Sequence, residues 1–503
     1  MKRTVSFIIV LCMLVSQAAL VSCNDKRGET AKELVLAGKD AQDYVILRAE
    51  KAGKTVKEAM TVLRKAIRDV YGSELVMKTD FVARNEQASI PEREIIIGTA
   101  ERDECNGIAE EMPAHGFVIK TAGKKLIICG KTDKLTAKAV EYFIGKYVRA
   151  GKDSLTLPAD LNDTREADLT ASASAGMTYS DMAVGVFSDF CKKYYENGFV
   201  TGGRFWTSSE MLETFVDAYE AMKTKEYLTL AVEYADGIKA AFKSNWLNNN
   251  YNDDLMWITI AYLRLGKATG DPDYYRVAKG LFNSVYKRAC DDKLGGGLYW
   301  RGEKDSKNSC VNCPAAIAAA YLYEYTKDEG YLDKAKGIID WVVSTLYDDG
   351  FVYDAINTEG GINKWASTYN QGTFIGACTL IWRFSGDEKY IGYADRAVSY
   401  TIDKMFGGGV IGTEYTGGDL PGFKGILTRW IYRYAVLRDD PDVLIWLQTN
   451  ADAAYSHRNG EGLIWTKWDE PTPDELTENH IAFGMSTAVS LMFNSIPWWD
   501  AGN

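Results

Sequence analysis

Residues 270–278 read Gly-Asp-Pro-Asp-Tyr-Tyr-Arg-Val-Ala, and this short stretch decides the fold because its pattern recurs along the chain. A polar turn leads to Tyr274, and Ala278 follows four residues later, which places both side chains on one face of a helix. The repeat falls at every second predicted helix, so its unit is a helical hairpin. Three further pairs share the spacing after a similar turn: Tyr227 and Ala231, Tyr331 and Ala335, Tyr390 and Ala394.

Helical periodicity continues from residue 179 to the C-terminus, with short connections on one side. It predicts twelve helices, at 179–196, 207–222, 225–244, 252–267, 272–289, 310–326, 331–346, 369–384, 388–405, 422–437, 440–456 and 478–494. Six hairpins can form an open solenoid or a closed (α/α)6 barrel. The loops after odd-numbered helices are long and rich in Gly, Trp, Asn and Asp. That asymmetry favours a mainly α chain with a closed barrel and an active site on the long-loop face.

A different pattern precedes the barrel, where helices and strands are mixed. Residues 94–99 predict a strand, residues 116–120 and 125–130 a hairpin, and residues 50–71 and 136–147 two helices. We therefore expect a small α/β domain at 31–158, a linker rich in Ala, Ser, Thr and Asp at 159–178, and the barrel at 179–503.

The first residues have the pattern of a bacterial export signal. Lys2 and Arg3 supply positive charge, and residues 5–15 are almost entirely apolar but too short to span a bilayer comfortably. The run Leu-Val-Ser-Cys at 20–23 then resembles a lipobox, in which the cysteine is acylated. We expect a signal peptide at 1–22, a lipid anchor on Cys23 and a tether at 23–30, with ordinary signal cleavage nearby as the alternative. The protein would then be exported and attached to a bacterial membrane, on its periplasmic or cell-surface face.

The amino-acid composition limits the partners and the catalytic groups to be expected. The net charge of -11 argues against a nucleic-acid partner. Three His and nine Cys lack the spacing of a metal site or a disulfide framework, so no metal and no cofactor are expected. The thirteen Trp and thirty Tyr suit the stacking of sugar rings, although large helical cores explain them equally well. The chemistry is therefore expected from carboxylates or hydroxyls, with a hard cation bound by oxygen atoms as the alternative.

Two adjacent carboxylates, Asp253 and Asp254, stand at the predicted start of a helix, in the run Tyr-Asn-Asp-Asp-Leu-Met-Trp at 251–257. Cleavage of a glycosidic bond needs one carboxylic acid to protonate the leaving oxygen and one carboxylate to attack or to activate water. Neighbouring helical residues can hold their carboxyl carbons about 5–7 Å apart, which is compatible with retaining enzymes. Mutual repulsion raises one pKa, which suits an acid/base. Capping of the helix N-terminus is the alternative explanation.

Three further long loops, each entering an inner helix, favour a sugar site at this end of the barrel. Glycines let the backbone approach a ligand, and Asn, Gln and Arg offer paired hydrogen bonds to neighbouring hydroxyls. The loops are GGGLYWR at 295–301 with Lys307, Asn308 and Asn312 after it, WASTYNQG at 365–372, and FKGI at 423–426 with Arg429. Stacking faces are offered by Trp300, Trp365, Trp465 and Trp468. Each motif alone is more often structural than functional.

Together, YNDDLMW at 251–257, GGGLYW at 295–300, TYNQG at 368–372 and FKGIL at 423–427 resemble glycoside hydrolase family 76, the endo-α-1,6-mannanases. The resemblance covers almost the whole region from Tyr179 to Trp499, with the motifs in the family's order. It implies an (α/α)6 barrel and a retaining mechanism on α-1,6-linked mannose, with Asp253 as nucleophile and Asp254 as acid/base. IIIGT at 95–99 and the segments 116–132 and 138–148 resemble the accessory domain ahead of α-glucuronidases, which implies no activity.

The expected substrate is α-mannan or a manno-oligosaccharide. We expect it to be bound by residues of these motifs: Tyr251, Asn252, Trp257, Gly297, Trp300, Asn308, Asn312, Tyr369, Gln371, Gly372 and Arg429. Three other functions stay open. A glycan-binding lipoprotein without activity would look similar, although the intact aspartate pair counts against it. A transglycosylase could use the same fold, and an unsaturated-uronyl hydrolase would want a basic pocket, which these loops do not predict.

Overall fold

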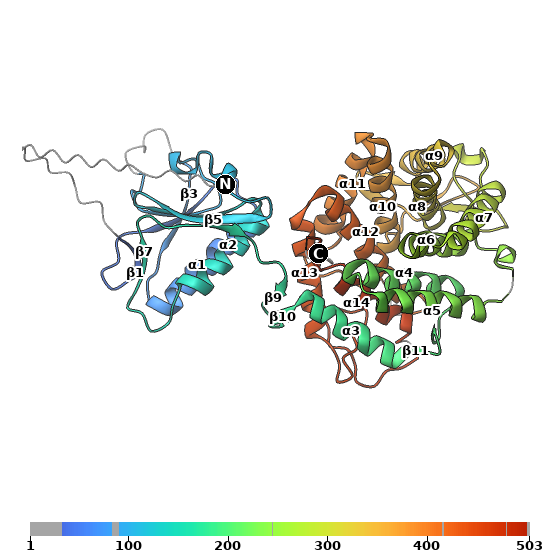
Figure 1. Ribbon diagram of the computed structural model, residues 1–503. Helices are drawn as coiled ribbons and strands as arrows, with labels where there is room; N and C mark the ends of the chain where they lie inside the picture. Colours follow the sequence, from blue (N-terminus) through green and yellow to red (C-terminus); the bar gives the residue numbers. More distant parts are fainter. Residues whose placement is uncertain (1–32, 83–89, 244, 415–416, 479, 500–503) are drawn as a thin grey trace, which may run out of the picture. The chain divides into compact units, whose positions relative to one another are not determined.

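The computed structural model describes residues 33–499, except 83–89, 244, 415–416 and 479. The chain divides into two compact units, which are described separately (Figure 1). The smaller unit is drawn from residues up to Thr164, and the larger one comprises residues 165–503 with the short segments 109–117 and 130–139. The expected signal peptide at 1–22, the acylated Cys23 and the tether at 23–30 lie outside the described residues and stay predictions. Within the described ranges, none of the helices combines the length and apolar character needed to cross a bilayer.

A six-stranded sheet with the order β3-β2-β4-β6-β5-β8 lies at the centre of the smaller unit. β2 runs parallel to β3 and β4, and β4 runs parallel to β6. α1 (Lys54–Tyr71) packs on β2 and β4, and α2 spans Asp133–Tyr147. β1 (Glu33–Gly38) and β7 (Ser154–Pro158) form a separate antiparallel pair. The sheet strands are β2 (Val45–Arg48), β3 (Val76–Thr79), β4 (Glu94–Ile97), β5 (Gly116–Ala122), β6 (Lys125–Gly130) and β8 (Asn162–Glu166). The predicted α/β character is confirmed, with the strand and the hairpin at the predicted places.

The predicted linker at 159–178 is wrong over its first part, because β8 belongs to the sheet. All of its residues but Asp163 are at least partly exposed, so this edge strand needs no apolar alternation. Asp163 accepts hydrogen bonds from Lys146 Nζ at 2.7 Å and from the Tyr147 hydroxyl at 2.9 Å, which pair its buried carboxylate. A polar strand of this kind resembles a linker in sequence.

The larger unit contains twelve α-helices in the part of residues 165–499 that the structure describes. Six form an inner ring, in which each helix packs on the next and α14 packs on α4. They are α4 (Phe205–Met222), α6 (Asn252–Thr269), α8 (Ser309–Thr326), α10 (Thr368–Ser385), α12 (Phe423–Arg438) and α14 (Ala482–Phe493). The other six are the outer helices: α3 (Tyr179–Tyr194), α5 (Lys225–Ala241), α7 (Pro272–Ala289), α9 (Glu329–Thr345), α11 (Glu388–Ser399) and α13 (Pro441–Ser456). The closed (α/α)6 barrel is confirmed, and the open solenoid is excluded.

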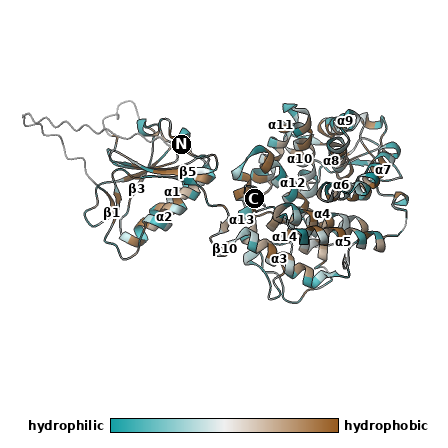
Figure 2. Ribbon diagram, in the orientation of Figure 1, coloured by the Kyte–Doolittle hydropathy of each residue, from teal (hydrophilic) through white to brown (hydrophobic). Residues whose placement is uncertain are grey.

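The inner-ring helices and the outer helices differ in how much of their surface is buried. Residues 309–322 of α8 and 368–381 of α10 are buried without interruption, as expected for helices with neighbours on every side. Outer helices bury one stripe, which in α7 includes Tyr274 and Ala278. Figure 2 shows hydrophilic residues along the outer helices α7, α9 and α11. The aromatic–alanine repeat is therefore the inward face of the outer helices.

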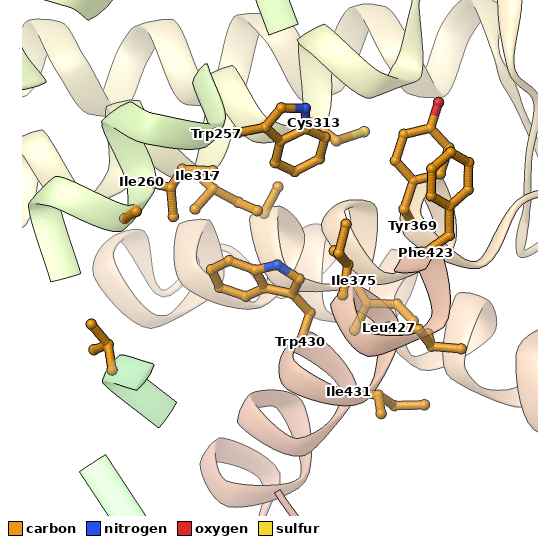
Figure 3. Packing of buried hydrophobic residues seen from close by; sticks show 14 of the residues in the cluster. Trp257, Ile260, Cys313, Ile317, Tyr369, Ile375, Phe423, Leu427, Trp430 and Ile431 are labelled. Atoms are coloured by element: carbon orange, nitrogen blue, oxygen red, sulfur yellow. The ribbon is translucent and has the colours of Figure 1, made fainter. Parts of the chain in front are cut away.

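Large side chains fill the barrel centre, where Trp257 and Trp430 pack among aliphatic residues (Figure 3). α10 and α12 approach closely because Gly376 faces Trp430 and Gly372 faces the backbone of Leu427. A Cβ at Gly372 would lie 2.7 Å from the Leu427 Cα, so this position requires glycine for packing.

A buried ionic network joins α4, α6 and α12. Arg429 donates to Glu210 and Asp217, and Arg264 donates to Glu213, Asp217 and Glu220. Four acids meet three arginines here: Glu210, Glu213, Asp217, Glu220, Arg264, Arg429 and Arg433. Burial, helped by the charge of Glu213, raises the pKa of Glu210 to about 8. The raised pKa favours the protonated form of Glu210 at neutral pH.

Candidate active site

A cleft of about 570 Å³ opens where five inner helices begin. Its lining comes from the first residues of α4, α6, α8, α10 and α12 and from the loops before them. Helix N-termini present backbone N–H groups and the positive ends of their dipoles, which favour carboxylates and partly negative oxygens there. The lining residues are Arg204, Phe205, Trp206, Tyr251, Asp253, Asp254, Trp257, Trp300, Asn308, Cys310, Asp354, Trp365, Tyr369, Asp419 and Phe423.

Seven of the predicted catalytic and binding residues meet in this cleft: Tyr251, Asp253, Asp254, Trp257, Trp300, Asn308 and Tyr369. Two aromatic pairs form its apolar surfaces. The ring centres of Tyr251 and Trp300 lie 5.3 Å apart, and those of Tyr369 and Phe423 lie 4.0 Å apart. Figure 3 shows the second pair side by side. Trp365 also lines the cleft, as expected for a stacking face. Such faces can pack against the apolar C–H groups of sugar rings.

The aspartate pair lies in the first turn of α6. The start of this helix is held by Asn252, whose amide donates to the Tyr299 carbonyl at 2.8 Å and accepts from Arg288 Nε at 2.6 Å. Arg288 also donates to the carbonyls of Leu247 and Asn249, which fixes the preceding loop. Neither aspartate serves as the cap of α6, because its N-cap residue is Tyr251.

The two carboxyls differ in their partners. Asp254 Oδ2 accepts from Asn249 Nδ2 at 2.9 Å, and Asp253 Oδ2 accepts from Cys310 Sγ at 3.6 Å. Asp253 Oδ1 is buried and has no hydrogen-bond partner among the described residues. Burial raises the pKa of the Cys310 thiol, so the thiol keeps the proton that it donates.

Burial and mutual repulsion place a proton on this pair. Burial and the charge of Asp254 raise the pKa of Asp253 to about 8. Burial raises the pKa of Asp254 to about 6, while the Asn249 amide favours its ionised form. The two carboxyls titrate as one unit, which holds a single proton near neutral pH. One protonated and one ionised carboxyl is the state that acid/base catalysis with a nucleophile requires.

Six predicted substrate-binding residues lie outside the lining of the cleft: Asn252, Gly297, Asn312, Gln371, Gly372 and Arg429. Gly297 has a φ of 75° and faces the ring of Trp341, where a Cβ would clash. Asn312 is fully buried and bonds both the N–H and the carbonyl of Leu298. These two residues shape the loop before α8.

Gln371 and Arg429 also have structural partners. The Gln371 amide accepts from the Val352 N–H at 2.7 Å and donates to the Gly350 carbonyl at 2.9 Å. Arg429 belongs to the ionic network, and Gly372 belongs to the contact between α10 and α12. The stacking faces expected at Trp465 and Trp468 are buried, with Lys424 Nζ 3.7 Å from the ring centre of Trp468.

The prediction missed two carboxylates of the cleft, Asp354 and Asp419. Burial raises the pKa of Asp354, which accepts from the amides of Asn363 and Asn370. Asp419 accepts from Trp206 Nε1 at 3.0 Å. Both stand in loops that lead to inner helices, and that position is the only sequence signal that distinguishes them from the other acids of the chain.

The larger unit matches known proteins over most of its length. The model described as Glycosyl hydrolase family 76 matches residues 170–497. The GH76A alpha-1,6-mannanase from Salegentibacter sp. HEL1_6 is 31% identical, with a TM-score of 0.59, and the match covers 63% of this chain and 98% of that one. An inactive variant of that mannanase, with two consecutive aspartates replaced by asparagine, is known in complex with alpha-1,6-mannotriose.

The first curated relatives match a shorter part. The mannan endo-1,6-alpha-mannosidase DCW1 of Candida albicans is 26% identical over 223 residues, which are 39% of this chain and 49% of the relative. The chain thus spans about half the length of the first such relatives. The family match covers more than half of the 503 residues and includes the whole cleft. The chain belongs to glycosyl hydrolase family 76.

Proposed function

We propose that this chain is a retaining glycoside hydrolase that cleaves α-1,6-mannosidic bonds within mannan. The observation that carries the proposal is the pair of consecutive aspartates in the cleft, where burial raises the pKa of both carboxyls. The sequence contains four such pairs, beginning at Asp253, Asp291, Asp348 and Asp439, and only the first lines the cleft. We take it as the counterpart of the two consecutive aspartates that are replaced in the inactive Salegentibacter mannanase.

The cleft suits a neutral sugar. Its lining carries four carboxylates, of Asp253, Asp254, Asp354 and Asp419, and a single cationic side chain, of Arg204. An acidic cleft disfavours uronic-acid substrates, whose carboxylates need a basic pocket. Carboxylate and amide groups beside aromatic faces can bind the hydroxyls and the ring of a mannose residue together.

In the proposed double displacement, ionised Asp253 attacks the anomeric carbon of the mannose bound in the cleft. Asp254 transfers its proton to the glycosidic oxygen, so the bond to the leaving sugar breaks as the glycosyl–Asp253 ester forms. Asp254 then takes a proton from water, whose oxygen attacks the same carbon and releases Asp253. The two inversions retain the anomeric configuration.

This mechanism requires the shared proton on Asp254 at the moment of attack. In the empty cleft the proton favours Asp253, the more deeply buried of the two. Positive charge that develops on the sugar lies beside Asp253 in the transition state and stabilises its ionised form. The proton therefore moves to Asp254 as the reaction begins.

Product analysis tests the proposal directly. Debranched α-1,6-mannan and α-1,6-mannotetraose are incubated with the protein, and the products are separated by size and followed by NMR. We expect shorter α-1,6-linked oligosaccharides whose new reducing ends first appear as the α-anomer. Binding of the polymer without any products would instead identify a glycan-binding protein, and first appearance of the β-anomer would exclude the double displacement.

The thiol of Cys310 should influence which of the two aspartates holds the shared proton. Its S–H stabilises ionised Asp253, and the same thiol interacts with Tyr369. Cys310→Ala should therefore raise the pKa of Asp253, lower the population of the reactive form and reduce kcat/KM about threefold. The alkaline limb of the pH profile of kcat/KM on α-1,6-mannotetraose should move up by about half a unit. The remaining charged or titratable groups of the cleft, Arg204, Tyr251, Asp254, Asp354, Tyr369 and Asp419, are not replaced by this substitution.

Cys313→Ala is the matched control. Cys313 lies one turn further along α8, is equally buried and has Thr373 as its partner instead of Asp253. Both substitutions leave a similar cavity, and Cys310→Ala is the one that removes a contact with Asp253. An equal pH shift in both variants would show that Cys310 acts through packing alone.

A further inference from the structure

A second hollow of about 260 Å³ adjoins the cleft on the side of Asp254. Six residues line it: Phe205, Phe242, Asn245, Trp246, Asn248 and Asn249. Phe205 lines both the hollow and the cleft, so one ring forms a wall of each. Asn249 is the residue that donates to the Asp254 carboxylate. The hollow thus joins the cleft at the carboxyl that the mechanism uses as its acid.

Three aromatic rings form the apolar side of the hollow. The ring of Phe205 lies 5.4 Å from that of Phe242 and 5.3 Å from that of Trp246. Trp246 Nε1 donates to the Phe242 carbonyl at 2.8 Å, and the Trp246 ring packs edge-on against Tyr262. These contacts fix the orientation of the indole before any ligand arrives, which lowers the entropy cost of binding.

Three amides supply the polar side. Asn249 is engaged at both ends of its amide, since the nitrogen donates to Asp254 and the oxygen accepts from the Tyr251 N–H. The Asn245 oxygen accepts from the Leu247 N–H. The side chain of Asn248 is exposed, and within the described part of the chain no hydrogen bond engages it. Hydrogen-bonding groups of Asn245 and Asn248 are therefore available to the hydroxyls of a ligand.

We infer that this hollow is the subsite for the leaving-group sugar, the mannose residue on the reducing-end side of the bond that is cut. The inference rests on the proposed function. The acid must reach the glycosidic oxygen, and that oxygen is bonded to the leaving-group sugar. A sugar held against Asn249 and the aromatic rings therefore lies next to Asp254. Its apolar ring face meets Phe205 and Trp246, and its hydroxyls meet Asn245 and Asn248.

The experiment compares two substrates that differ in the leaving group. α-1,6-Mannotetraose has leaving-group sugars, whereas α-1,6-mannobiosyl fluoride releases fluoride and has none. Trp246→Ala should lower kcat/KM on the tetraose about tenfold, and Asn248→Ala about threefold. Both variants should hydrolyse the fluoride at the wild-type rate. Because Asn248 is exposed, its variant serves if Trp246→Ala fails to fold.

Leu247→Ala is the matched control, since Leu247 belongs to the same helical turn (Trp246–Asn248) but lies outside the hollow. It should match the wild type on both substrates. Equal losses on the tetraose and the fluoride, or no loss in either variant, would overturn the subsite while leaving the proposed function intact. A wild-type protein that cleaves neither substrate would overturn the proposed function, and the subsite with it.

Discussion

Asp253→Asn should lower the hydrolysis of α-1,6-mannan by about 10⁴-fold, and Asp254→Asn by about 10²- to 10⁴-fold. Asparagine keeps the shape of the side chain but removes the nucleophilic carboxylate in the first variant and the proton donor in the second. Asp292→Asn is the control, because Asp292 ends another consecutive pair, is exposed and makes no capping hydrogen bond. It should retain wild-type turnover.

Reaction with azide shows which aspartate is the nucleophile and which is the acid/base. A mannosyl fluoride needs no protonation of its leaving group, so Asp254→Asn should still form the glycosyl–Asp253 ester and transfer it to azide, giving the α-mannosyl azide. Asp253→Asn should react with azide only by direct displacement, giving the β-anomer. The opposite assignment of the two azides would exchange the roles of Asp253 and Asp254. Full activity of either variant on mannan would exclude the mechanism.

Arg429→Met should lower the free energy of unfolding of the larger unit by about 3–5 kcal/mol. The Arg429 guanidinium is buried and donates to Glu210 at 2.7 Å and to Asp217 at 2.8 Å. Methionine would leave these carboxylates without their cation inside the barrel. The midpoint of denaturant-induced unfolding measures the loss, and KM for mannotetraose well below that midpoint should stay unchanged.

Arg438→Met provides the comparison on the same helix. The Arg438 side chain is 37% exposed and lies 3.6 Å from Asp395, so its loss should cost less than about 1 kcal/mol. A raised KM with unchanged stability in Arg429→Met would restore the interpretation of Arg429 as a sugar ligand.

Local patterns predicted the barrel well, and they singled out two aspartates that the structure places in the cleft. The aromatic–alanine repeat reports the buried stripe of the outer helices, and a stripe follows from sequence alone. Asp253 and Asp254 could be found because both stand in one short motif at a helix start. The N-termini of the inner helices converge at one end of the barrel, so residues at those starts meet without knowledge of the loops.

The sequence was a poor guide where tertiary contacts decide whether a residue reaches the cleft. Arg429 stands six residues into α12, about 9 Å from its start, and so faces the ionic network below the cleft. Gln371 lies close to a helix start, but its amide bonds the loop at 350–352. Asp354 and Asp419 reach the cleft through the paths of their loops, which no periodicity reports.

Because Glu210 is protonated inside the barrel at neutral pH, the folded protein holds a proton that it gives up on unfolding. Its pKa of about 8 in the barrel compares with an ordinary value of 4.5, so at neutral pH the native state binds a proton that the unfolded chain releases. The contribution of Glu210 to stability is therefore greatest below its ordinary pKa and declines as the pH rises through about 8. Unfolding at neutral pH acidifies its surroundings, and the heat of unfolding includes the heat with which the buffer takes up that proton.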